Sequence, residues 1–462
     1  MKILLVTSSA RGHAIAEALA RSSQKPELIS LSPNRNPGLR ALAKDHFAMN
    51  IMDFPAVIDI AKNEKPAFAV IGPDDPIGAG LADALEGIGI PSVAPKKRLA
   101  QVETSKAFTR NLLEKYGIDA SPKFRSFSAN AKGRMDKRHL RKEITAFIED
   151  TLDGNYVVKY DALKGGKGVK VSGEHLENVE DGVDYALECI EECGRVVVEE
   201  KLIGVEFSLL SFVSGKKVVD MPAVQDHKRA YEGDTGPNTG GMGTYTDSDH
   251  SLPFLEKKDL ARAREINRLA AEALLQECGE PYKGILYGGF IAVREGVKLI
   301  EFNARFGDPE ALNVLPLLTT DFVAVCQGII SGELTDNLVR FAKKATVCKY
   351  ITPHGYPENK DHKGQEVKFP EMPDNARLYF GDITEEHDGR LLLGGSRSAA
   401  IVGIGDTIAE AEKIAEDLCK QVEGPVRYRS DIGTKALIDE RIRRMKEIRS
   451  NSSHATAPDC MR

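Results

Sequence analysis

The first hundred residues alternate short apolar runs with amphipathic stretches. These runs and stretches occupy residues 3–6, 14–19, 28–31, 57–60, 67–71, 77–85 and 90–93. Strands that alternate with helices in this way form a parallel sheet with helices on both faces. Because ligands of such sheets bind at the carboxyl ends of the strands, the first turn, residues 7–13, is a candidate phosphate site. An ordinary helix N-cap would explain this turn nearly as well.

The remaining pattern predicts a β-rich middle and a mixed end. Helical periodicity is found at residues 103–116, 139–152, 179–189, 255–278 and 407–421. Strand-like runs are found at residues 156–159, 169–171, 195–202, 205–213, 216–220, 284–294 and 297–302. Ser121-Pro122 breaks the pattern, and the charged segment 129–150 carries no readable chemistry.

We therefore expect an α/β protein with several domains. The expected divisions are an N-terminal parallel-sheet domain at 1–102, a central domain at 103–335 with a mobile lid at about 121–195, a C-terminal mixed α/β domain at 336–435, and a helical end with a disordered tail at 436–462. A chain of this length has enough apolar residues to give each domain a core.

Composition adds limits on location and partners. Hydrophobic residues make up 42% and charged residues 29%, with a net charge of −6. No apolar run reaches the roughly 18 residues of a membrane span, and nothing attracts the chain to nucleic acid. The seven scattered cysteines lack metal-site spacing, so we expect reduced thiols. These features favour a cytoplasmic protein with small-molecule substrates, for which a monomer is the simplest expectation.

A strand near residue 300 carries chemistry on one face. If it runs through Arg305, the alternation places Glu301, Asn303 and Arg305 on one face and Ile300 on the other. A carboxylate and an amide oxygen suit a magnesium ion that also binds nucleotide phosphates. Arg305 would offset negative charge on a phosphoryl group in transfer. The alternative is an exposed sheet face with a fortuitous ion pair, but the apolar opposite face favours a buried site.

Two further segments could contact a nucleotide. Residues 159–169 place lysines around glycines, which suits a loop that covers phosphates, although a flexible cationic hairpin has the same composition. No Walker motif is present, since Gly168 follows Lys167. The acidic residues at 199–200 and Glu206 could accept hydrogen bonds from ribose hydroxyls, or could belong to an exposed charged hairpin.

The segment 225–245 is too polar for a core and too rich in turn-formers for a helix. Glycine and proline fix its backbone, while Asp226, Lys228, Arg229 and Asp234 supply both charges. A small zwitterion or a phosphorylated substrate would require this mixture. A solvated surface loop is the alternative if the segment is taken alone.

The cationic glycine loop is followed along the chain by the acidic hairpin and then by the Glu-x-Asn-x-Arg strand. This order of motifs resembles that of the ATP-grasp fold, in which two subdomains hold ATP between antiparallel sheets. Residues 225–229, 236–243 and 301–310 narrow the resemblance to the phosphoribosylamine-glycine ligases of purine biosynthesis. Matches at 72–76, 103–106, 394–395 and 431–433 extend it over nearly the whole chain. The first domain would then be a pre-ATP-grasp domain and the second an ATP-grasp domain.

The resemblance implies that ATP and Mg²⁺ or Mn²⁺ serve the joining of glycine to 5-phosphoribosylamine, through a glycyl phosphate. It implies catalytic roles for Arg305, Lys228 and Asp226, and metal binding by Glu301 and Asn303. The implied ATP contacts are Lys106, Lys159, Lys167, Gly168, Glu199, Glu200, Leu202 and Glu206. The implied substrate contacts are Arg11, His13, Asn238, Thr239, Gly240, Asp308 and Pro309.

Two departures from the family pattern leave alternatives open. The family's first turn ends Gly-Gly-Arg-Glu-His, whereas this chain reads Ser9-Ala10-Arg11-Gly12-His13. Gly289 offers no side-chain oxygen where a further metal ligand can occur, so water would complete the coordination. A related ligase with a different amine or acid is therefore one alternative, and a non-catalytic nucleotide-binding protein is another.

Overall fold

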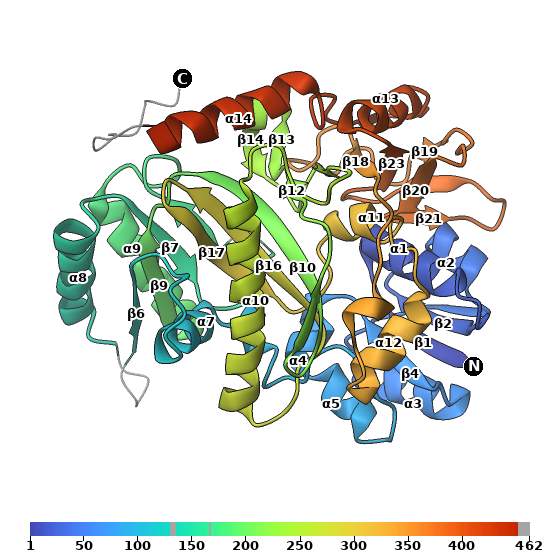
Figure 1. The fold of residues 1–462 in the computed structure, drawn as a ribbon, viewed down its shortest axis with the longest axis horizontal. Coiled ribbons are helices and arrows are strands. Elements are labelled where there is room, and N and C mark those ends of the chain that lie inside the picture. The colour runs from blue at the N-terminus through green and yellow to red at the C-terminus, as the bar shows by residue number, and fades with distance from the viewer. Residues whose placement is uncertain (130–134, 166–167, 451–462) are drawn as a thin grey trace.

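A computed structural model describes residues 1–129, 135–165 and 168–450. Figure 1 shows the N-terminal domain at the lower right, the C-terminal sheet above it, and the lid subdomain (residues 124–200) at the far left of the central sheet. No helix in the described ranges is long and apolar enough to cross a membrane. The described cysteines are free thiols, as the sequence predicts.

The N-terminal domain is a parallel sheet with strand order β3-β2-β1-β4-β5. The strands are β1 (Lys2–Val6), β2 (Glu27–Ser32), β3 (Asp45–Ala48), β4 (Phe68–Ile71) and β5 (Ser92–Val93). The helices are α1 (Ser9–Ala20), α2 (Pro37–Leu42), α3 (Phe54–Glu64), α4 (Asp74–Ala79) and α5 (Leu81–Glu86). Residues 3–6 are fully buried, as expected for a strand covered on both faces. The predicted parallel sheet is confirmed.

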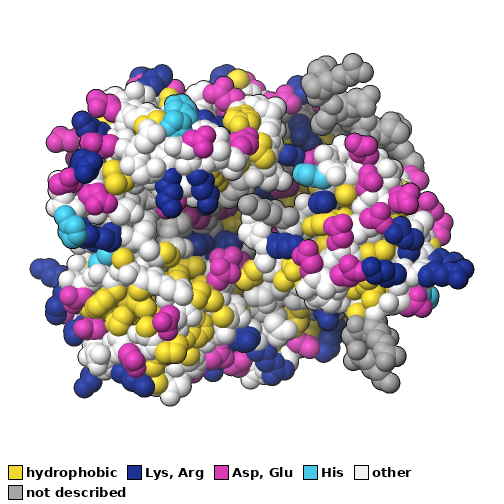
Figure 2. Space-filling view, turned by 180° about the vertical axis from the view of Figure 1, so that it is seen from behind, with side chains coloured by type: hydrophobic (Ala, Val, Ile, Leu, Met, Phe, Trp, Pro, Cys, Tyr) yellow, Lys and Arg dark blue, Asp and Glu magenta, His cyan; other side chains and the backbone are white. Residues whose placement is uncertain are grey.

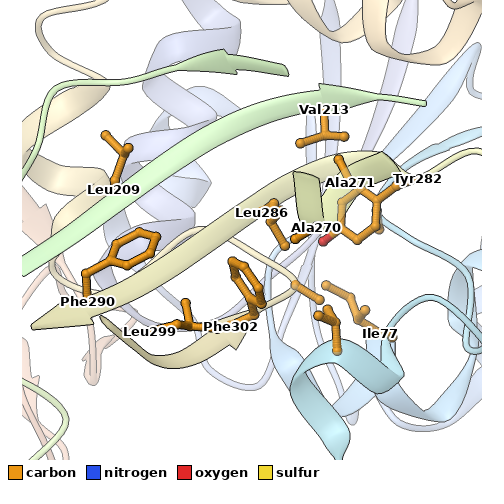
Figure 3. Packing of buried hydrophobic residues seen from close by; sticks show 14 of the residues in the cluster. Ile77, Leu209, Val213, Ala270, Ala271, Tyr282, Leu286, Phe290, Leu299 and Phe302 are labelled. Carbon is orange, nitrogen blue, oxygen red and sulfur yellow. The ribbon is translucent and has the colours of Figure 1, made fainter. Parts of the chain in front are cut away.

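The central domain is built on an antiparallel sheet with order β11-β10-β16-β17. Its elements are α6 (Gln101–Thr104), α7 (Lys106–Lys115), β10 (Val205–Ser214), β11 (Lys217–Asp220), α10 (Lys257–Cys278), β16 (Lys283–Val293), β17 (Gly296–Asn303), α11 (Glu310–Val314) and α12 (Phe322–Ser331). Ala270 and Ala271 of α10 pack beside Val213 and Leu286 of the sheet (Figure 3). These small side chains let the helix lie close to the strands.

The lid subdomain is a second antiparallel sheet, with order β6-β9-β7-β8. Its elements are β6 (Phe124–Ser128), α8 (Lys137–Ala146) with a π-helical turn at Phe147–Thr151, β7 (Tyr156–Tyr160), β8 (Val169–Val171), α9 (Val179–Cys193) and β9 (Arg195–Glu200). The charged segment predicted to be partly helical thus supplies α8, whose Leu140 and Ile144 join the core of the subdomain. The two antiparallel sheets form the expected ATP-grasp arrangement.

The C-terminal sheet recruits strands from the polar segment 225–245. Its order is β12-β15-β18-β23-β20, and β24 also pairs with β18. Its elements are β12 (Gln225–Asp226), β15 (Gly243–Thr246), β18 (Ala345–Pro353), β20 (Ala376–Phe380), β23 (Ala399–Gly405), α13 (Ile408–Cys419) and β24 (Val426–Arg427), with a small sheet of β19 (Glu366–Val367), β22 (Leu391–Leu393) and β21 (Ile383–Glu385) beside it. A loop was expected here, but Asp226 pairs with Thr244 and Thr244 pairs with Cys348, so the segment contributes two strands to this sheet. Such long-range pairing has no local signal.

A hairpin and a helix complete the fold. The hairpin consists of β13 (Arg229–Tyr231) and β14 (Thr235–Asn238), and the helix is α14 (Lys435–Ser450). Figure 1 shows α14 lying across the top of the molecule, above the hairpin and the central sheet. Residues 451–462, expected as a disordered tail, lie outside the described ranges.

Candidate active site

Strand β17 carries a β-bulge at the centre of the site. Between Leu299 and Glu301 its pairing with β16 shifts by one residue, so Ile300 is the extra residue. The prediction of regular alternation was therefore wrong in two ways. The strand ends at Asn303 instead of running through Arg305, and Ile300 lines the same cavity as Glu301. An inserted residue bends a strand and turns its neighbours, which is why side chains expected on opposite faces meet here.

A cavity opens beside Glu301. Strands β10, β16 and β17 and residues 226–228 line it. The lining residues are Glu206, Phe207, Ser208, Asp226, Lys228, Tyr287, Gly289, Phe290, Ile300 and Glu301. Seen from behind, the surface of the molecule is hollowed near its centre, where Lys, Arg, Asp and Glu side chains gather (Figure 2). Because the lining contains both apolar and charged groups, it suits a ligand that has both an apolar and a charged portion.

Positive charge converges on Glu301. Burial raises the pKa of its carboxyl group, but Lys228, Lys106, Lys159 and Arg305 together outweigh burial and lower it. Glu301 is therefore an ionised carboxylate with four cationic side chains around it, three of which also pair with other carboxylates. Such an arrangement attracts a polyanion or a metal bound to one.

Arg305 lies between a carboxylate and the amide of Asn303. Its Nη2 lies 3.1 Å from Glu103 Oε1 and donates to Asn303 Oδ1 at 3.1 Å. Burial lowers the pKa of Arg305, but Glu103 and Asp74 raise it further than burial lowers it. Glu103 also accepts a hydrogen bond from the backbone N–H of Ala304 at 2.7 Å. The guanidinium is thus a fixed positive charge, and Asn303 Oδ1 keeps a second lone pair for a metal.

A buried ion cluster joins the lid to the central sheet. Glu199 of β9 accepts from Arg110 Nε at 2.6 Å and from Arg110 Nη2 at 3.0 Å, and lies 2.7 Å from Lys159 Nζ. Arg110 Nη2 and Lys159 Nζ also donate to the carbonyl of Ile300, at 2.8 and 3.0 Å. Burial raises the pKa of Glu199, but the two cations lower it to about 2. The carboxylate of Glu199, expected near the nucleotide, is therefore engaged by these two side chains.

Asp226 and Lys228 face the cavity beside Glu301. Lys228 Nζ lies 3.7 Å from Glu206 Oε2, and this carboxylate raises the pKa of Lys228. Burial and the nearby Glu310 raise the pKa of Asp226. A Cβ atom at Gly241 would lie 2.6 Å from Asp226 Oδ1, and φ is 110° there, so this position requires glycine. The structure thus places two of the three predicted catalytic residues, Asp226 and Lys228, at the cavity wall.

Arg397 of the C-terminal domain joins two predicted substrate segments. Its Nη1 donates to the carbonyls of Gly240, Gly241 and Asp308 at 2.7, 2.9 and 3.1 Å. Its Nη2 lies 3.6 Å from Asp308 Oδ2, and Tyr350 donates to Asp308 Oδ1 at 2.5 Å. Sequence reasoning missed Arg397 because its contacts cross domains. The preceding Gly394-Gly395 motif was the one available signal.

The predicted substrate residues at the end of β14 close a loop. Thr239 donates from its backbone N–H and its Oγ1 to the carbonyl of Lys228, at 2.7 and 2.9 Å. Asn238 pairs with Arg229 across the hairpin and is exposed. Pro309 adjoins Gly241, where an added Cβ would lie 2.7 Å from its Cδ. These contacts bring residues 228, 239 and 309 to one region.

In the altered first turn, Thr7 packs directly against Gly12. A Cβ atom at Gly12 would lie 2.2 Å from Thr7 Oγ1, so the threonine fills the space that a larger residue 12 would need. Ser9 has a φ of 62°, in the left-handed region that favours glycine. Arg11 is buried and donates from Nη1 to the carbonyl of Phe306 at 2.7 Å. The turn therefore lies directly against the end of the β17 segment.

His13 lies at the contact between α1 and β20. Its Nδ1 accepts from the backbone N–H of Phe380 at 3.0 Å, and its ring stacks on that of Phe380 with centroids 5.7 Å apart. Burial lowers the pKa of His13 to about 4, so the imidazole is neutral at pH 7. The structure places this residue where the N-terminal and C-terminal domains meet.

The predicted phosphate-covering loop approaches α7. Lys106 Nζ donates to the carbonyl of Ala162 at 3.0 Å, and Gly168 accepts from the backbone N–H of Tyr160 at 2.8 Å. Lys167 lies outside the described residues. Glu200 ends β9 and accepts from the backbone N–H of Lys123 at 3.2 Å, and the half-buried Leu202 lies in the link to β10.

Comparison with known proteins identifies the family. Models of the phosphoribosylglycinamide synthetase N domain, ATP-grasp (A) domain and C domain match residues 1–103, 104–311 and 346–435. The phosphoribosylamine–glycine ligase of Methanococcus vannielii is 47% identical over 455 residues, which cover 97% of this chain and 100% of the relative. The chain belongs to the phosphoribosylglycinamide synthetase family. The ligase of the same name from Methanosarcina barkeri is 46% identical over 449 residues, with the same coverage of both chains.

Comparison with solved structures shows that the family's fold extends over nearly the whole chain. A crystal structure of phosphoribosylamine–glycine ligase from Thermotoga maritima has a TM-score of 0.76 at 26% identity, and the match covers 93% of this chain and 100% of that one. Biotin carboxylase from Campylobacter jejuni has a TM-score of 0.70 at 12% identity, covering 96% and 95% of the two chains, which shows a shared fold alone. The predicted ATP-grasp architecture is confirmed.

The donor set of this family member fits a metal bound together with a nucleotide. Within residues 1–129, 135–165 and 168–450, no three His, Cys, Asp or Glu side chains form a preformed metal cage. Glu301 nevertheless offers an ionised carboxylate at the cavity wall, and Asn303, two residues along β17, offers an amide oxygen. Mg²⁺ is usually held by one or two carboxylates plus phosphate oxygens and water, so these two residues are sufficient on the protein side.

Proposed function

We propose that this protein joins glycine to 5-phosphoribosylamine, converting ATP to ADP and phosphate and forming glycinamide ribonucleotide. Family membership supports the reaction class, and the full-length relatives carry the name of this ligase. The observation that carries the proposal is the convergence of Lys106, Lys159, Lys228 and Arg305 on Glu301. A protein that only bound a nucleotide would have little use for this arrangement.

The chemistry divides into two transfers. A carboxylate oxygen of glycine attacks the terminal phosphorus of ATP, ADP leaves, and glycyl phosphate forms. The amine nitrogen of phosphoribosylamine then attacks the acyl carbon, phosphate leaves, and the nitrogen loses a proton. Fixed cations stabilise the negative charge that develops on the transferred phosphoryl group. Arg305 and Lys228 are the residues proposed for this role, since Lys228 lines the cavity and both are cations that act on Glu301.

Asp226 is the group proposed to accept the proton from the amine. Burial and Glu310 raise its pKa, which brings the carboxylate closer in basicity to the nitrogen it would serve. Asp226 lines the cavity together with Lys228 and Glu301. These observations support Asp226 as the base that accepts the amine proton.

Glu301 and Asn303 are proposed to hold Mg²⁺, or Mn²⁺ in its place. When bound, the ion would neutralise phosphate charge and align the terminal phosphate. Lys106, Lys159 and Gly168 are proposed to contact the phosphates, and Glu199, Glu200, Leu202 and Glu206 to surround the nucleoside. We propose that movement of the lid excludes water from the acyl phosphate.

The experiment that tests the proposal replaces Glu301 by glutamine. Glu301→Gln keeps the size of the side chain and removes its charge. We expect formation of ADP that depends on glycine and phosphoribosylamine to fall by about 100-fold or more, as losses of single charge-stabilising groups do. The matched control is Glu295→Gln, in the exposed turn between β16 and β17, which should keep wild-type turnover.

Circular dichroism spectra would verify that both variants are folded. Wild-type protein that forms no ADP with both substrates present would contradict the proposed reaction. Turnover of Glu301→Gln within about threefold of wild type would contradict the role of this carboxylate.

A ligase of the same class with a different amine is the second candidate. It is favoured by one observation, the first turn in which Ser9 and Ala10 stand in place of the family's two glycines and Gly12 in place of its glutamate. A panel of amines offered with ATP and glycine separates the two functions. Preference for phosphoribosylamine supports the first candidate, and preference for another amine supports the second.

A further inference from the structure

The hairpin β13–β14 lies between two parts of the proposed substrate site. Lys228 immediately precedes β13, while Asn238 ends β14 and Thr239 follows it. The hydrogen bonds from Thr239 to the carbonyl of Lys228 close the base of the hairpin. Any displacement of the hairpin would therefore move Lys228 relative to Glu206 and Glu301.

One acidic residue of the hairpin is held by two arginines from the end of the chain. Asp234 lies in the turn with a φ of 55°, a left-handed conformation that is costly for a residue other than glycine. Its Oδ1 accepts from Arg429 Nη1 at 2.8 Å, and its Oδ2 forms an ion pair with Arg441 Nη2. Burial raises the pKa of Asp234, but His227, Arg441 and Arg429 lower it further. The turn is thus fixed by charge and not by its own sequence preference.

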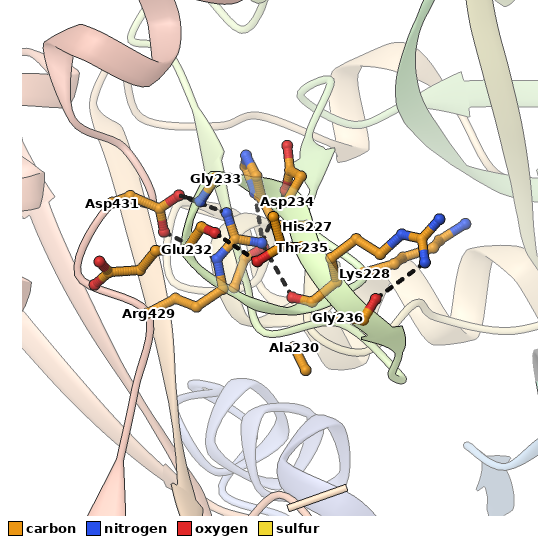
Figure 4. Close-up of polar contacts among 12 residues, drawn as sticks. His227, Lys228, Ala230, Glu232, Gly233, Asp234, Thr235, Gly236, Arg429 and Asp431 are labelled. Atoms are coloured by element: carbon orange, nitrogen blue, oxygen red, sulfur yellow. Dashed lines mark hydrogen bonds and ion pairs between the residues drawn. The ribbon is translucent and has the colours of Figure 1, made fainter. Parts of the chain in front are cut away.

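Further bonds attach the hairpin to residues 427–431. Arg429 Nη1 donates to the carbonyl of Arg229 at 3.1 Å, and Asp431 Oδ2 accepts from the backbone N–H of Gly233 at 3.0 Å. Arg429 is itself held by Asp431, at 2.9 Å for Nε to Oδ1 and 2.7 Å for Nη2 to Oδ2. Figure 4 shows Arg429 and Asp431 meeting the turn at Glu232, Gly233 and Asp234.

Arg441 extends this attachment to the central domain through α14. Met445 of the helix is buried, and Arg449 forms ion pairs with Glu256 and with the fully buried Asp259 at the start of α10. The helix is therefore docked at one end on α10 while Arg441 reaches the hairpin. On the other side of the hairpin, Arg229 Nη2 donates to Glu174 Oε2 of the lid subdomain at 2.7 Å.

We propose that Arg441 and Arg429 are positioning residues, which set the hairpin so that Lys228 and residues 238–240 meet the glycine and the amine. This inference rests on the proposed function and assigns α14, which lies beyond the matched C domain, a part in substrate binding. The arginines act through Asp234 and touch no reacting atom. Their loss should weaken binding of glycine and phosphoribosylamine without weakening binding of ATP, whose proposed contacts lie on α7, on the lid and at the start of β10.

The test replaces Arg441 by glutamine and compares it with Arg444→Gln. Arg444 is an exposed residue of the same helix and serves as the matched control. In Arg441→Gln we expect KM for glycine or phosphoribosylamine to rise about tenfold, the effect of roughly 1.4 kcal/mol of binding free energy. Affinity for ATP measured by calorimetry should stay within twofold of wild type. Asp234→Asn should raise KM similarly, and the double variant should not exceed the larger single effect, because both substitutions remove one interaction.

Hydrogen exchange of residues 229–238 without substrates supplies a second readout. Exchange should be faster in Arg441→Gln than in wild type and unchanged in Arg444→Gln. KM values within twofold of wild type, additive effects in the double variant, or an equal loss of ATP affinity would each overturn the proposal. If wild-type protein shows no ligase turnover, the proposed function fails, and the exchange comparison still decides whether Arg441 orders the hairpin.

Discussion

Replacing Arg110 by methionine tests how the lid is joined to the site. Arg110 is 2% exposed, binds Glu199 through two nitrogens, and donates to the carbonyls of Leu299 and Ile300 beside the bulge. Arg110→Met keeps a long apolar side chain and removes the charge. It leaves Glu199 buried with Lys159 as its remaining cationic partner within this cluster.

The magnitude follows from the pKa of Glu199. Its fall from 4.5 to about 2 corresponds to about 3 kcal/mol of stabilisation of the ionised form, at 1.36 kcal/mol per pH unit. Because the folded pKa is depressed, this stabilisation is present above pH 4.5 and is lost as the pH falls toward 2. Breaking a buried ion pair by removing one partner costs about 3–5 kcal/mol. We therefore expect Arg110→Met to destabilise the lid junction by at least about 3 kcal/mol at pH 7.

Hydrogen exchange is the suitable assay because a chain with several domains does not unfold in one step. Amides of β9 and β7 should exchange about 100-fold faster in Arg110→Met, while those of β1 should be unaffected and serve as an internal reference. The matched control is Arg125→Met. It removes another Arg–Glu pair of the lid, in which Arg125 Nη2 lies 3.1 Å from Glu143 at the surface, and such pairs contribute about 0–1 kcal/mol.

A double-mutant cycle with Glu199→Gln isolates the pair itself. We expect a coupling free energy of about 3 kcal/mol between Arg110 and Glu199. Coupling below about 0.5 kcal/mol, or equal effects of Arg110→Met and Arg125→Met on β9, would refute the reasoning that this buried cluster joins the lid to the central sheet.

Two further predictions concern acid stability and the first turn. Burial lowers the pKa of His227 to about 4, so between pH 6.5 and 4 the unfolded chain binds a proton that the folded chain does not, and stability should fall as the pH falls through this window. His227 should account for about 3 kcal/mol of the free energy of unfolding lost over this window. The free energy of unfolding measured with urea should therefore depend less steeply on pH in His227→Gln than in wild type. Equal pH dependence in the two proteins would contradict the role of His227. Gly12→Ala should destabilise the protein by about 1–3 kcal/mol because the new Cβ meets Thr7, and Thr7→Gly should restore most of the loss. A melting temperature of Gly12→Ala equal to that of wild type would rule out this clash.

Local patterns in the sequence were sufficient for most elements. The alternation of residues 3–6 with 14–19 gave the first strand and helix, and the long amphipathic stretch before Cys278 gave α10, because these periodicities record which face each element buries. Glu301 and Asn303 could be proposed together since residues two apart on a strand share a face. The bulge at Ile300 could not be anticipated, because it depends on pairing with β16.

The sequence by itself determined the fold class and the residue types that a phosphoryl-transfer site requires. Tertiary structure alone decided how these groups are held. Arg110 and Glu199 are 89 residues apart, and Arg397 and Gly240 are 157 apart, so no local pattern could pair them. Strand β15 likewise pairs with β18, about a hundred residues later, and β12 pairs in turn with β15. Burial and charge pairing arise when distant segments meet, which is why the ionisation of the site could be read only from the folded molecule.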